Sequence, residues 1–466
     1  MRYLSTRGQA PEQNFAGVLL AGLADDGGLY MPESWPVFSG ADLRALRGLP
    51  YPELAARVLA PFMEESIKFA DLQAMCRRAY AGFTNKAIAP LVQLDTNIYA
   101  LELFHGPTLA FKDMALQLVG HLFEHVLAET GGRVNIVGAT SGDTGSAAIE
   151  ACANRERISI TILHPEGKTS EVQRRQMTTV HADNVLNIAV AGNFDDCQNI
   201  VKALFAESGF RTRMNLSAVN SINFARIAAQ IPYYIYAALN LGAPEREVAV
   251  AVPTGNFGNI LAAWAAKQMG VPISRFIVAS NRNDILHRFL ASNDMSKKPV
   301  EESLSPSMDI GVSSNFERLL FEFLGRDALQ TKQHMENFSL NGKMPVSDAA
   351  WRAIRAQFTS FRLSDEQTLT EIARLYRESG YLADPHTIIG IAAAREMGPI
   401  GLPVIAAATA HPAKFPDAIE KAVGSRPPLP PHLHDLYERD EAFIRAPNDW
   451  THIAGLVEQK FANRNA

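Results

Sequence analysis

Short apolar runs along the chain alternate with turns that carry Gly or Asp and then with helical stretches. Runs without polar interruption are typical of strands that are buried on both faces of a sheet. Strands that alternate with helices predict an α/β fold, in which parallel sheets are covered by helices on both faces. The clearest runs span residues 134–138, 158–163, 185–191, 248–252 and 404–408.

Two segments depart from this alternation. Residues 1–95 are predicted to form an N-terminal cap, and residues 316–381 lack strand-like runs and are predicted to form a helical insertion. Within the insertion, Ser364 and Gln367 have the spacing of a capping box at a helix start. Asp384 followed by Pro385 predicts a second helix start, because proline is favoured at the first helical position.

Composition narrows the class of protein. The 466 residues are 47% hydrophobic and 20% charged, which is ordinary for a globular protein of two or three domains. The net charge of -5 argues against a nucleic-acid partner. No apolar stretch approaches the roughly 18 residues of a membrane-spanning helix, and the apolar run 18–24 is too short for a secretory signal.

The cysteines are scattered and have no CxxC spacing, which argues against a disulfide framework and a zinc cage. They are Cys76, Cys152 and Cys197. We therefore expect a cytoplasmic protein with no metal, no membrane partner and no nucleic acid.

One lysine follows three apolar residues in the sequence. Lys112 follows Leu109, Ala110 and Phe111 in the stretch FHGPTLAFKDM. An apolar setting lowers the pKa of a lysine and so favours the uncharged, nucleophilic amine. The stretch therefore contains either a functional amine or a helix-surface charge that happens to follow a phenylalanine.

Two loops at predicted strand ends have the character of anion sites. PTGNFGN (253–259) precedes a helix, whose free N–H groups and positive dipole end attract anions. ATSGDTG (139–145) offers hydroxyls and two glycines that permit close approach of a carboxylate or phosphate. Either loop could instead be an ordinary strand-to-helix turn, with Asp143 or Thr144 as the helix cap in the second.

Two further motifs carry less information. HPEGKT (164–169) resembles the end of a nucleotide-binding P-loop, but Ile162 occupies the position of that motif's first glycine. We therefore expect no ATP site and expect Lys168 to be a surface or lid charge. ATAHP (408–412) places Thr409 just past a predicted strand, and Lys414 beyond it is expected to be solvated or hydrogen-bonded.

Several motifs stand in a fixed order from about residue 5 to about residue 420. They are STRG (5–8), DGGLYMPESWP (26–36), FHGPTLAFKD (104–113), TSGDTG (140–145), NSINFARI (220–227), PTGNFGN (253–259), SPSMDIGVSSNFERL (305–319) and ATAHP (408–412). This ordered set resembles the threonine synthases, in particular their longer bacterial and fungal branch. These enzymes belong to the tryptophan-synthase-β-like group (fold type II) of pyridoxal-phosphate enzymes.

The resemblance implies two open, largely parallel sheets flanked by helices. A smaller mobile α/β domain, residues 113–235, would close over a larger cofactor-binding domain made of residues 96–112 and 236–466. Residues 1–95 would form the N-terminal cap, and the helical additions of the longer branch would account for residues 316–381.

The resemblance also implies a cofactor site for pyridoxal 5'-phosphate. Lys112 would carry the cofactor as a Schiff base, with Phe111 against the pyridine ring. Asp143 would lie near the ring hydroxyl, where many relatives have asparagine. Thr409 would face the pyridine nitrogen, and a threonine there can leave the ring a weaker electron sink than an aspartate would. The residues implied for the cofactor phosphate are Gly255, Asn256, Phe257, Gly258 and Asn259.

The implied reaction converts O-phospho-L-homoserine and water into L-threonine and phosphate by β,γ-elimination and replacement, with Lys112 also moving the protons. Asn223 and Arg226 are three apart and can share a helix face, so they are candidates for the substrate phosphate. The alternative is that Arg226 pairs with a surface acid. Candidates for the rest of the substrate are Thr108, Thr140, Ser141, Gly142 and Thr144, with His105 weaker and Lys168, Gln173 and Gln176 in a mobile lid.

Other functions fit some of the same motifs. A phospho-lyase of this architecture would release phosphate and form a keto acid instead of threonine. A protein that kept the fold and lost the chemistry would bind without catalysis, although the intact set of Lys112, GNFGN and Thr409 speaks against it. The sequence leaves both a monomer and a homodimer open.

Overall fold

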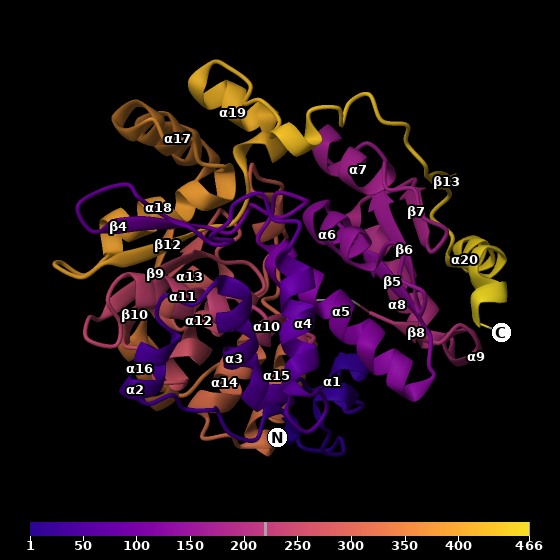
Figure 1. Cartoon of the computed structure of the whole chain (residues 1–466), viewed down its shortest axis with the longest axis horizontal. Helices are drawn as coiled ribbons and strands as arrows, with labels where there is room; N and C mark the ends of the chain where they lie inside the picture. Colours follow the sequence, from indigo (N-terminus) through magenta and orange to yellow (C-terminus); the bar gives the residue numbers. More distant parts are fainter. Residues whose placement is uncertain (219–220, 466) are drawn as a thin grey trace.

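The chain folds around two sheets that lie side by side in a computed structural model, which describes residues 1–218 and 221–465 (Figure 1). Helices cover both faces of each sheet, which confirms the predicted α/β architecture with two largely parallel sheets. Asn220 of the motif NSINFARI lies outside the described residues.

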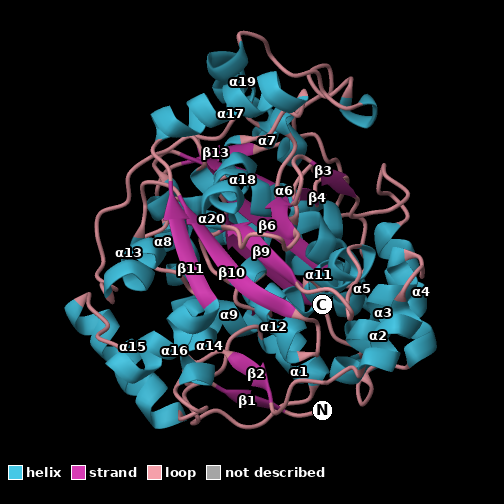
Figure 2. Ribbon diagram, turned by 90° about the vertical axis from the view of Figure 1, so that its left-hand side faces the viewer, coloured by secondary structure: helices cyan, strands magenta, loops and turns pink. Residues whose placement is uncertain are grey.

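The larger sheet has six strands, and β3 alone runs antiparallel to its neighbour. Alternate side chains of β9 enter different cores: Val250 and Val252 pack on one face, and Ala249 and Ala251 on the other. Burial on both faces explains the uninterrupted apolar run. In spatial order the strands are β11 (Phe358–Arg362), β10 (Ile273–Ser280), β9 (Val248–Pro253), β12 (Val404–Ala408), β4 (Ile98–Glu102) and β3 (Leu91–Gln93) (Figure 2).

Two groups of helices cover the larger sheet. Those on one face are α11 (Ile231–Asn240), α12 (Gly258–Gln268), α13 (Ile285–Ser292), α14 (Phe316–Phe323), α15 (Ala328–Asn341) and α16 (Asp348–Gln357). Those on the other face are α17 (Asp365–Ser379), α18 (Pro385–Met397) and α19 (Pro416–Val423). Both predicted helix starts are confirmed, because Ser364 and Gln367 form a capping box on α17 and Asp384 caps α18.

The smaller sheet has five parallel strands, in the order β13 (Ile444–Ala446), β7 (Val185–Val190), β6 (Ile158–Pro165), β5 (Val134–Ala139) and β8 (Leu216–Ser217). On one face pack α5 (Lys112–Thr130) and α6 (Asp143–Cys152), with α7 (Glu171–Thr178) beside α6. On the other face lie α8 (Phe194–Ala206), α9 (Ser208–Arg213) and α20 (Trp450–Asn465). The carboxyl ends of both sheets therefore supply the loops that carry the predicted motifs.

The N-terminal residues form a layer that joins the two units. α3 and α4 pack against α11 and α5, and β1 pairs with β2 as a separate antiparallel ribbon. The layer consists of β1 (Tyr3–Ser5), α1 (Phe15–Ala21), β2 (Tyr30–Pro32), α2 (Gly40–Leu46), α3 (Tyr51–Met63) and α4 (Phe69–Tyr80). α10 (Phe224–Ala228) lies between this layer, α5 and α12.

Two predicted boundaries need correction. The segment 316–381 is mainly helical, but it contains β11, which pairs with β10 and buries Phe358. The end of the range 236–466 leaves the larger unit, because β13 pairs with β7 and α20 buries Phe461 against the smaller sheet. In both cases a short amphipathic segment gains burial by extending a sheet that is already formed.

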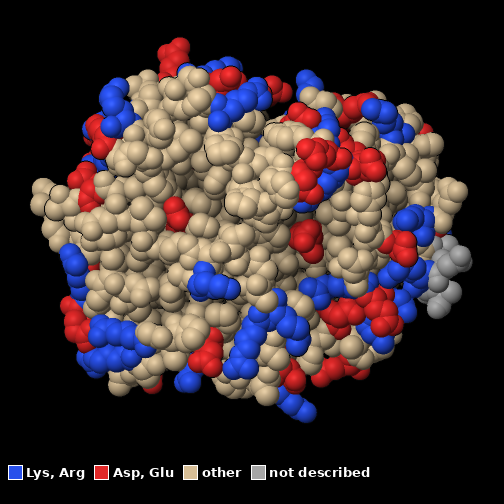
Figure 3. Space-filling model, turned by 45° about the horizontal axis from the view of Figure 1, so that its top comes forward, with Lys and Arg blue, Asp and Glu red and all other residues tan. Residues whose placement is uncertain are grey.

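The surface shows no single-sign field on the face seen in Figure 3, where acidic and basic side chains are interspersed around a largely uncharged centre. Within residues 1–218 and 221–465, no helix has the length and apolar character needed to cross a membrane.

Candidate active site

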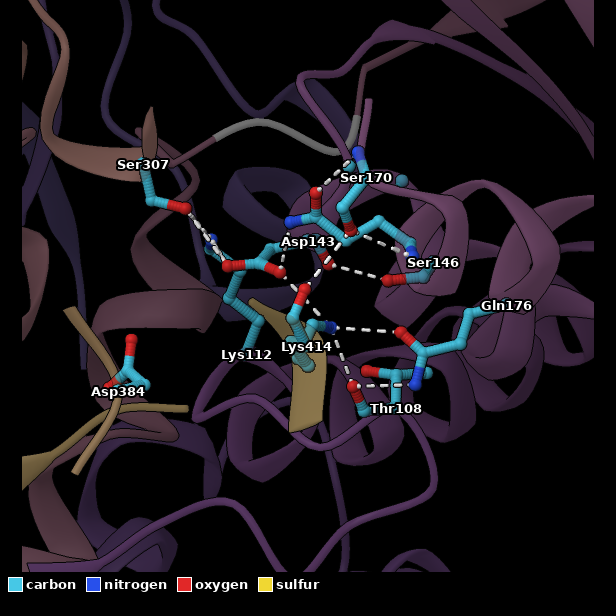
Figure 4. Close-up of polar contacts among 12 residues, drawn as sticks. Thr108, Lys112, Asp143, Ser146, Ser170, Gln176, Ser307, Asp384 and Lys414 are labelled. Atoms are coloured by element: carbon cyan, nitrogen blue, oxygen red, sulfur yellow. Dashed lines mark hydrogen bonds and ion pairs between the residues drawn. The ribbon is translucent and has the colours of Figure 1, made fainter. Parts of the chain in front are cut away.

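Lys112 is the first residue of α5 and lies at the junction of the two units (Figure 4). Its side chain is buried, and its Nζ lies 3.2 Å from Asp143 Oδ2 and 3.1 Å from Ser307 Oγ. Burial lowers the pKa of the Lys112 amine despite the opposing charge of Asp143, and the charges of Lys414 and Arg226 lower it further. The lowered pKa favours the uncharged, nucleophilic form of the amine.

The loop before Lys112 brings Thr409 to the same place. Leu109 has a φ of 61°, a conformation that turns the chain sharply, and Phe111 N–H donates to Thr409 O at 2.8 Å. Thr409 is buried at the end of β12, and its N–H donates to Thr387 Oγ1 at 3.0 Å. Lys112, Phe111 and Thr409 are thus neighbours, although the sequence separates Thr409 from the other two.

Asp143 is the centre of the polar contacts at the site. Its Oδ1 accepts from Gln173 Nε2 at 2.8 Å and lies 3.0 Å from Lys414 Nζ. Its Oδ2 accepts from Ser307 Oγ at 2.9 Å and from Lys112. Burial alone would raise the pKa of Asp143, but the charges of Lys112 and Lys414 outweigh it and hold the pKa well below its usual value. Asp143 is therefore an anion, and α6 has Gly142, not Asp143 or Thr144, at its cap.

Lys414 is hydrogen-bonded and not solvated, which decides between the two alternatives expected for it. Sequence analysis assigned neither Lys414 nor Ser307 to the site. A signal for Lys414 was present, since it stands between Ala413 and Phe415 as Lys112 stands beside Phe111. For Ser307 the sequence offered no signal beyond its membership of the SPSMDI motif.

The loop GNFGN turns from β9 into α12. Phe257 has a φ of 60° and points its ring into the core, 5.7 Å from the ring of Phe316, so it can offer only its backbone to a ligand. An added Cβ at Gly255 would lie 3.0 Å from Ser307 O, which explains the need for glycine there. Asn256 Oδ1 accepts from Ser314 Oγ at 3.0 Å.

The two polar atoms of the Asn259 side chain have different surroundings. Its Oδ1 accepts from the hydroxyls of Tyr233 and Tyr234, each at 2.6 Å. Its Nδ2 is buried, and among the described residues it has no hydrogen-bond partner. A buried amide nitrogen without an acceptor is costly, and a ligand oxygen would satisfy it.

The TSGDTG loop is shaped by its first residue. Thr140 Oγ1 accepts from the backbone N–H groups of Gly142 and Gly145, both at 2.9 Å. Thr140 therefore orders the loop, while the half-buried Ser141 and Thr144 remain the hydroxyls that could meet a substrate.

Arg226 and Asn223 separate in role. Asn223 caps α10 by accepting from Ala225 N–H at 3.0 Å, and it donates to Leu19 O at 2.9 Å. Arg226 is buried, and within the described part of the chain its Nε and Nη1 have no partner and it forms no ion pair. The alternative that Arg226 pairs with a surface acid is therefore not what the structure has. Burial lowers the pKa of Arg226 to about 10, so it remains a cation without a counter-ion.

Thr108 makes two hydrogen bonds to Asp113, the residue after Lys112. Its N–H and Oγ1 donate to the two oxygens of Asp113, at 2.8 Å and 2.7 Å. His105 lies 2.7 Å from Glu102 Oε2, and Lys168 is exposed. The hydrogen bonds of Thr108 therefore hold the loop ahead of Lys112.

Helix α5 also carries His121 and His125, whose spacing of four can place two ligands on one metal. His121 instead contacts Arg155 at 3.2 Å, and His125 lies 3.5 Å from Glu129. In residues 1–218 and 221–465, no three His, Cys, Asp or Glu side chains gather in a group that could hold a metal ion.

Known proteins share this arrangement over the whole chain. Three family models match in order: Threonine synthase N terminus at residues 2–80, Pyridoxal-phosphate dependent enzyme at residues 85–331, and Threonine synthase, C-terminal, at residues 387–457. A threonine synthase of Pseudomonas aeruginosa is 56% identical over 461 residues, which cover 98% of each chain. The chain belongs to the threonine synthase family.

Two solved threonine synthase structures share the fold. The pyridoxal-phosphate-bound enzyme of Brucella melitensis is 49% identical with a TM-score of 0.97, and the alignment covers 99% of each chain. The yeast enzyme is 38% identical with a TM-score of 0.94 and the same coverage of 99% of each chain. The predicted threonine synthase resemblance and its pyridoxal 5'-phosphate cofactor are thereby confirmed.

The threonine synthase site of this chain fits that cofactor chemically. Lys112 supplies a buried amine whose pKa is lowered, as bonding to an aldehyde requires. The start of α12 supplies backbone N–H groups, and the unpartnered Asn259 Nδ2 supplies a side-chain donor for a phosphate.

Proposed function

We propose that the chain converts O-phospho-L-homoserine and water into L-threonine and phosphate, the last step of threonine biosynthesis. It would act as a pyridoxal-phosphate-dependent carbon–oxygen lyase. The observation that carries the proposal is the buried, unpaired Arg226, whose charge acts on the buried amine of Lys112. A buried cation that has no counter-ion among the described residues, and whose charge reaches a nucleophilic amine, suits a substrate that carries both an anionic phosphate and an amino group.

The cofactor would be held at Lys112 and at the GNFGN loop. Phe111 would lie against its ring, Thr409 at its pyridine nitrogen and Asp143 at its hydroxyl. The phosphate would meet the backbone of Gly255–Gly258 and the side chain of Asn259. Bound there, the cofactor supplies an electron sink next to the amino group of the substrate.

Lys112 would move the protons. Its Nζ would take the proton from Cα of the substrate and then from Cβ, and phosphate would leave from Cγ. A proton would then return to Cγ, water would add at Cβ, and a last proton would return to Cα to give threonine. A small amine on a flexible stem can reach successive carbons, which a fixed carboxylate cannot. Asp143 and Ser307, within 3.2 Å and 3.1 Å of Nζ, would orient the amine between transfers.

The two anionic ends of the substrate would be held apart. Arg226 would bind the phosphate through its free Nε and Nη1. Ser141, Thr144 and the backbone at Gly142 would bind the carboxylate, on a loop that Thr140 orders. Asn223 and Thr108 stay candidates for contact with the substrate, and both already make hydrogen bonds within the protein.

We propose that the protein is a monomer or a homodimer. The three cysteines are free and buried, which supports a reducing compartment such as the cytoplasm.

The test combines a spectrum with product analysis. Purified protein should absorb visible light as a cofactor-bound lysine does, and Lys112→Ala should lose that band. With O-phospho-L-homoserine, the wild type should release phosphate and threonine in equal amounts. Keto acid as the main product would overturn the proposal in favour of a phospho-lyase.

Arg226→Met should lower kcat/KM by about 10- to 100-fold, because hydrogen bonds to charged groups contribute about 1.5–3 kcal/mol. Its cofactor absorbance should persist. The exposed Arg246→Met is the matched control and should retain full activity. Equal activity of the two variants would remove Arg226 from the substrate site.

A further inference from the structure

Lys414 is a second buried lysine at the site, and three oxygen atoms lie close to its nitrogen. Its Nζ lies 3.0 Å from Asp143 Oδ1, 3.0 Å from Gln176 Oε1 and 2.6 Å from Thr108 O (Figure 4). Thr108 and Gln176 accept hydrogen bonds from the Lys414 ammonium, and Asp143 forms an ion pair with it. These contacts fix the Lys414 nitrogen beside Asp143.

Lys112 has a different environment, although it shares the same carboxylate. Its Nζ contacts one oxygen of Asp143 and the hydroxyl of Ser307, which itself donates to that oxygen. The two lysines thus take opposite oxygens of Asp143, Lys414 on Oδ1 and Lys112 on Oδ2. Gln173 donates to Oδ1 as well and fixes the plane of the carboxylate.

Because the two lysines share the carboxylate of Asp143, Lys414 affects how strongly that carboxylate stabilises the protonated form of Lys112. A carboxylate with a lysine as its sole partner would stabilise the ammonium form of that lysine. Here Lys414 already neutralises Asp143, and its own charge repels a second cation nearby. The Lys112 nitrogen therefore loses its proton more readily than a lysine in a simple ion pair would.

The position of Lys414 is fixed by elements from both units. It ends the 3-10 helix η2 (Pro412–Lys414), just after β12, and its partners lie on α6, α7 and the loop before α5. The charged and titratable groups around Asp143, Lys112 and Lys414 are Asp113 on α5, Arg226 on α10 and His386 on α18.

We propose that Lys414 is a positioning residue: it holds Asp143 so that one carboxylate oxygen faces Lys112, and its fixed charge keeps the Lys112 nitrogen easily deprotonated. The inference rests on the proposed function only in taking Lys112 as the cofactor-bearing amine. It does not depend on whether the product is threonine or a keto acid.

The test is a pH titration of the holoenzyme's visible absorbance, which reports the proton on the nitrogen of Lys112. Lys414→Met should raise the midpoint by about one pH unit or more, because a nearby charge shifts a pKa by about 1–3 units. Asp143→Asn should shift the midpoint downward, since it removes the anion that favours the proton. Opposite signs from two neighbouring residues cannot come from a general loosening of the site.

Two further variants separate charge from packing. Lys414→Gln keeps a polar group toward Thr108 and Gln176 but removes the charge, so its midpoint should rise as in Lys414→Met. Lys267, which is partly buried in α12 and donates to Ile273 O at 2.7 Å, is the matched lysine, and Lys267→Met should leave the midpoint unchanged. A wild-type midpoint in Lys414→Gln, or a downward shift in either Lys414 variant, would overturn the proposal.

Discussion

Asp113, the residue after Lys112, is a carboxylate that the fold buries completely. It accepts two hydrogen bonds from Thr108, and this pair closes the turn that delivers Lys112 to the site. Gly106 leaves room for it, since a Cβ there would lie 2.5 Å from Asp113 Cβ. Asp113 therefore stabilises the turn, although burial of its charged carboxylate costs electrostatic free energy.

That cost makes protein stability depend on pH. Burial raises the pKa of Asp113 from 3.8 to about 6, so between these values the folded protein holds a proton that the unfolded chain has lost. Stability must therefore fall as pH rises through that window, by about 3 kcal/mol for a shift of this size. Asp113→Asn does not ionise, and Thr108 can donate through N–H while its hydroxyl accepts from the amide.

We expect urea unfolding between pH 4 and pH 7 to show Asp113→Asn gaining stability relative to the wild type as pH rises, with the gain levelling off above about pH 6. Parallel stability curves for the two proteins would contradict this account of Asp113.

At the scale of elements, the start of α6 depends on a glycine that no other residue can replace without strain. Gly142 has a φ of 138°, and an added Cβ would lie 2.5 Å from Gln173 Cδ. Gln173 would have to leave Asp143, so the effect of the change would reach the active site. Gly167 has a φ of 71° and nothing within 4 Å of its Cβ position, which makes it a matched control.

Gly142→Ala should destabilise the protein by about 2 kcal/mol or more and weaken cofactor binding, whereas Gly167→Ala should cost about 1 kcal/mol and leave cofactor binding intact. Thermal unfolding and titration with pyridoxal 5'-phosphate measure the two effects. Equal cofactor affinity in both variants would mean that Gln173 does not support Asp143.

The same scale explains which parts of the structure the sequence could predict. Strands buried on both faces leave long apolar runs, so the central strands of both sheets were predictable. β11 has the sequence FTSFR and β13 only IRA, and neither differs from a loop until a neighbouring strand is present. Edge strands of this kind are defined by the sheet that they join.

Some residues of the candidate site could likewise be predicted from the sequence, and others could not. The local sequence predicts Lys112 from its apolar setting and the GNFGN loop from its strand-to-helix turn. For Asn223 and Thr108 the sequence cannot separate a substrate contact from the capping and turn contacts that both residues make. Ser307 and Lys414 were missed because distant strand ends bring them to Asp143.

At the scale of the whole molecule, the C-terminal segment is a second connection between the two units, in addition to the N-terminal layer. It leaves the larger unit after α19 and runs past α7 to the outer edge of the smaller sheet (Figure 1). Glu441 accepts from Arg174 and Thr178 of α7, each at 2.9 Å, and Ala442 N–H donates to Thr178 O. Gln173 of the same helix contacts Asp143, so the segment also supports the active site.

Phe461 anchors the end of this segment in the core of the smaller unit. Phe461→Ala should destabilise the protein by about 3–5 kcal/mol, because it opens a cavity among buried apolar side chains. Trp450→Ala, in the same helix but 37% exposed, should cost about 1 kcal/mol or less. Chemical denaturation distinguishes them, and a similar small loss in both would show that α20 contributes little.

The order of the strands in the smaller sheet bears on how the chain is made. β7 ends at Val190, and its neighbour β13 begins at Ile444, after every strand of the larger sheet. During translation β7 therefore emerges from the ribosome long before its partner and remains an unpaired edge. Such an edge is a template for pairing with other chains, so nascent chains are exposed to association through β7 until the C-terminus is released.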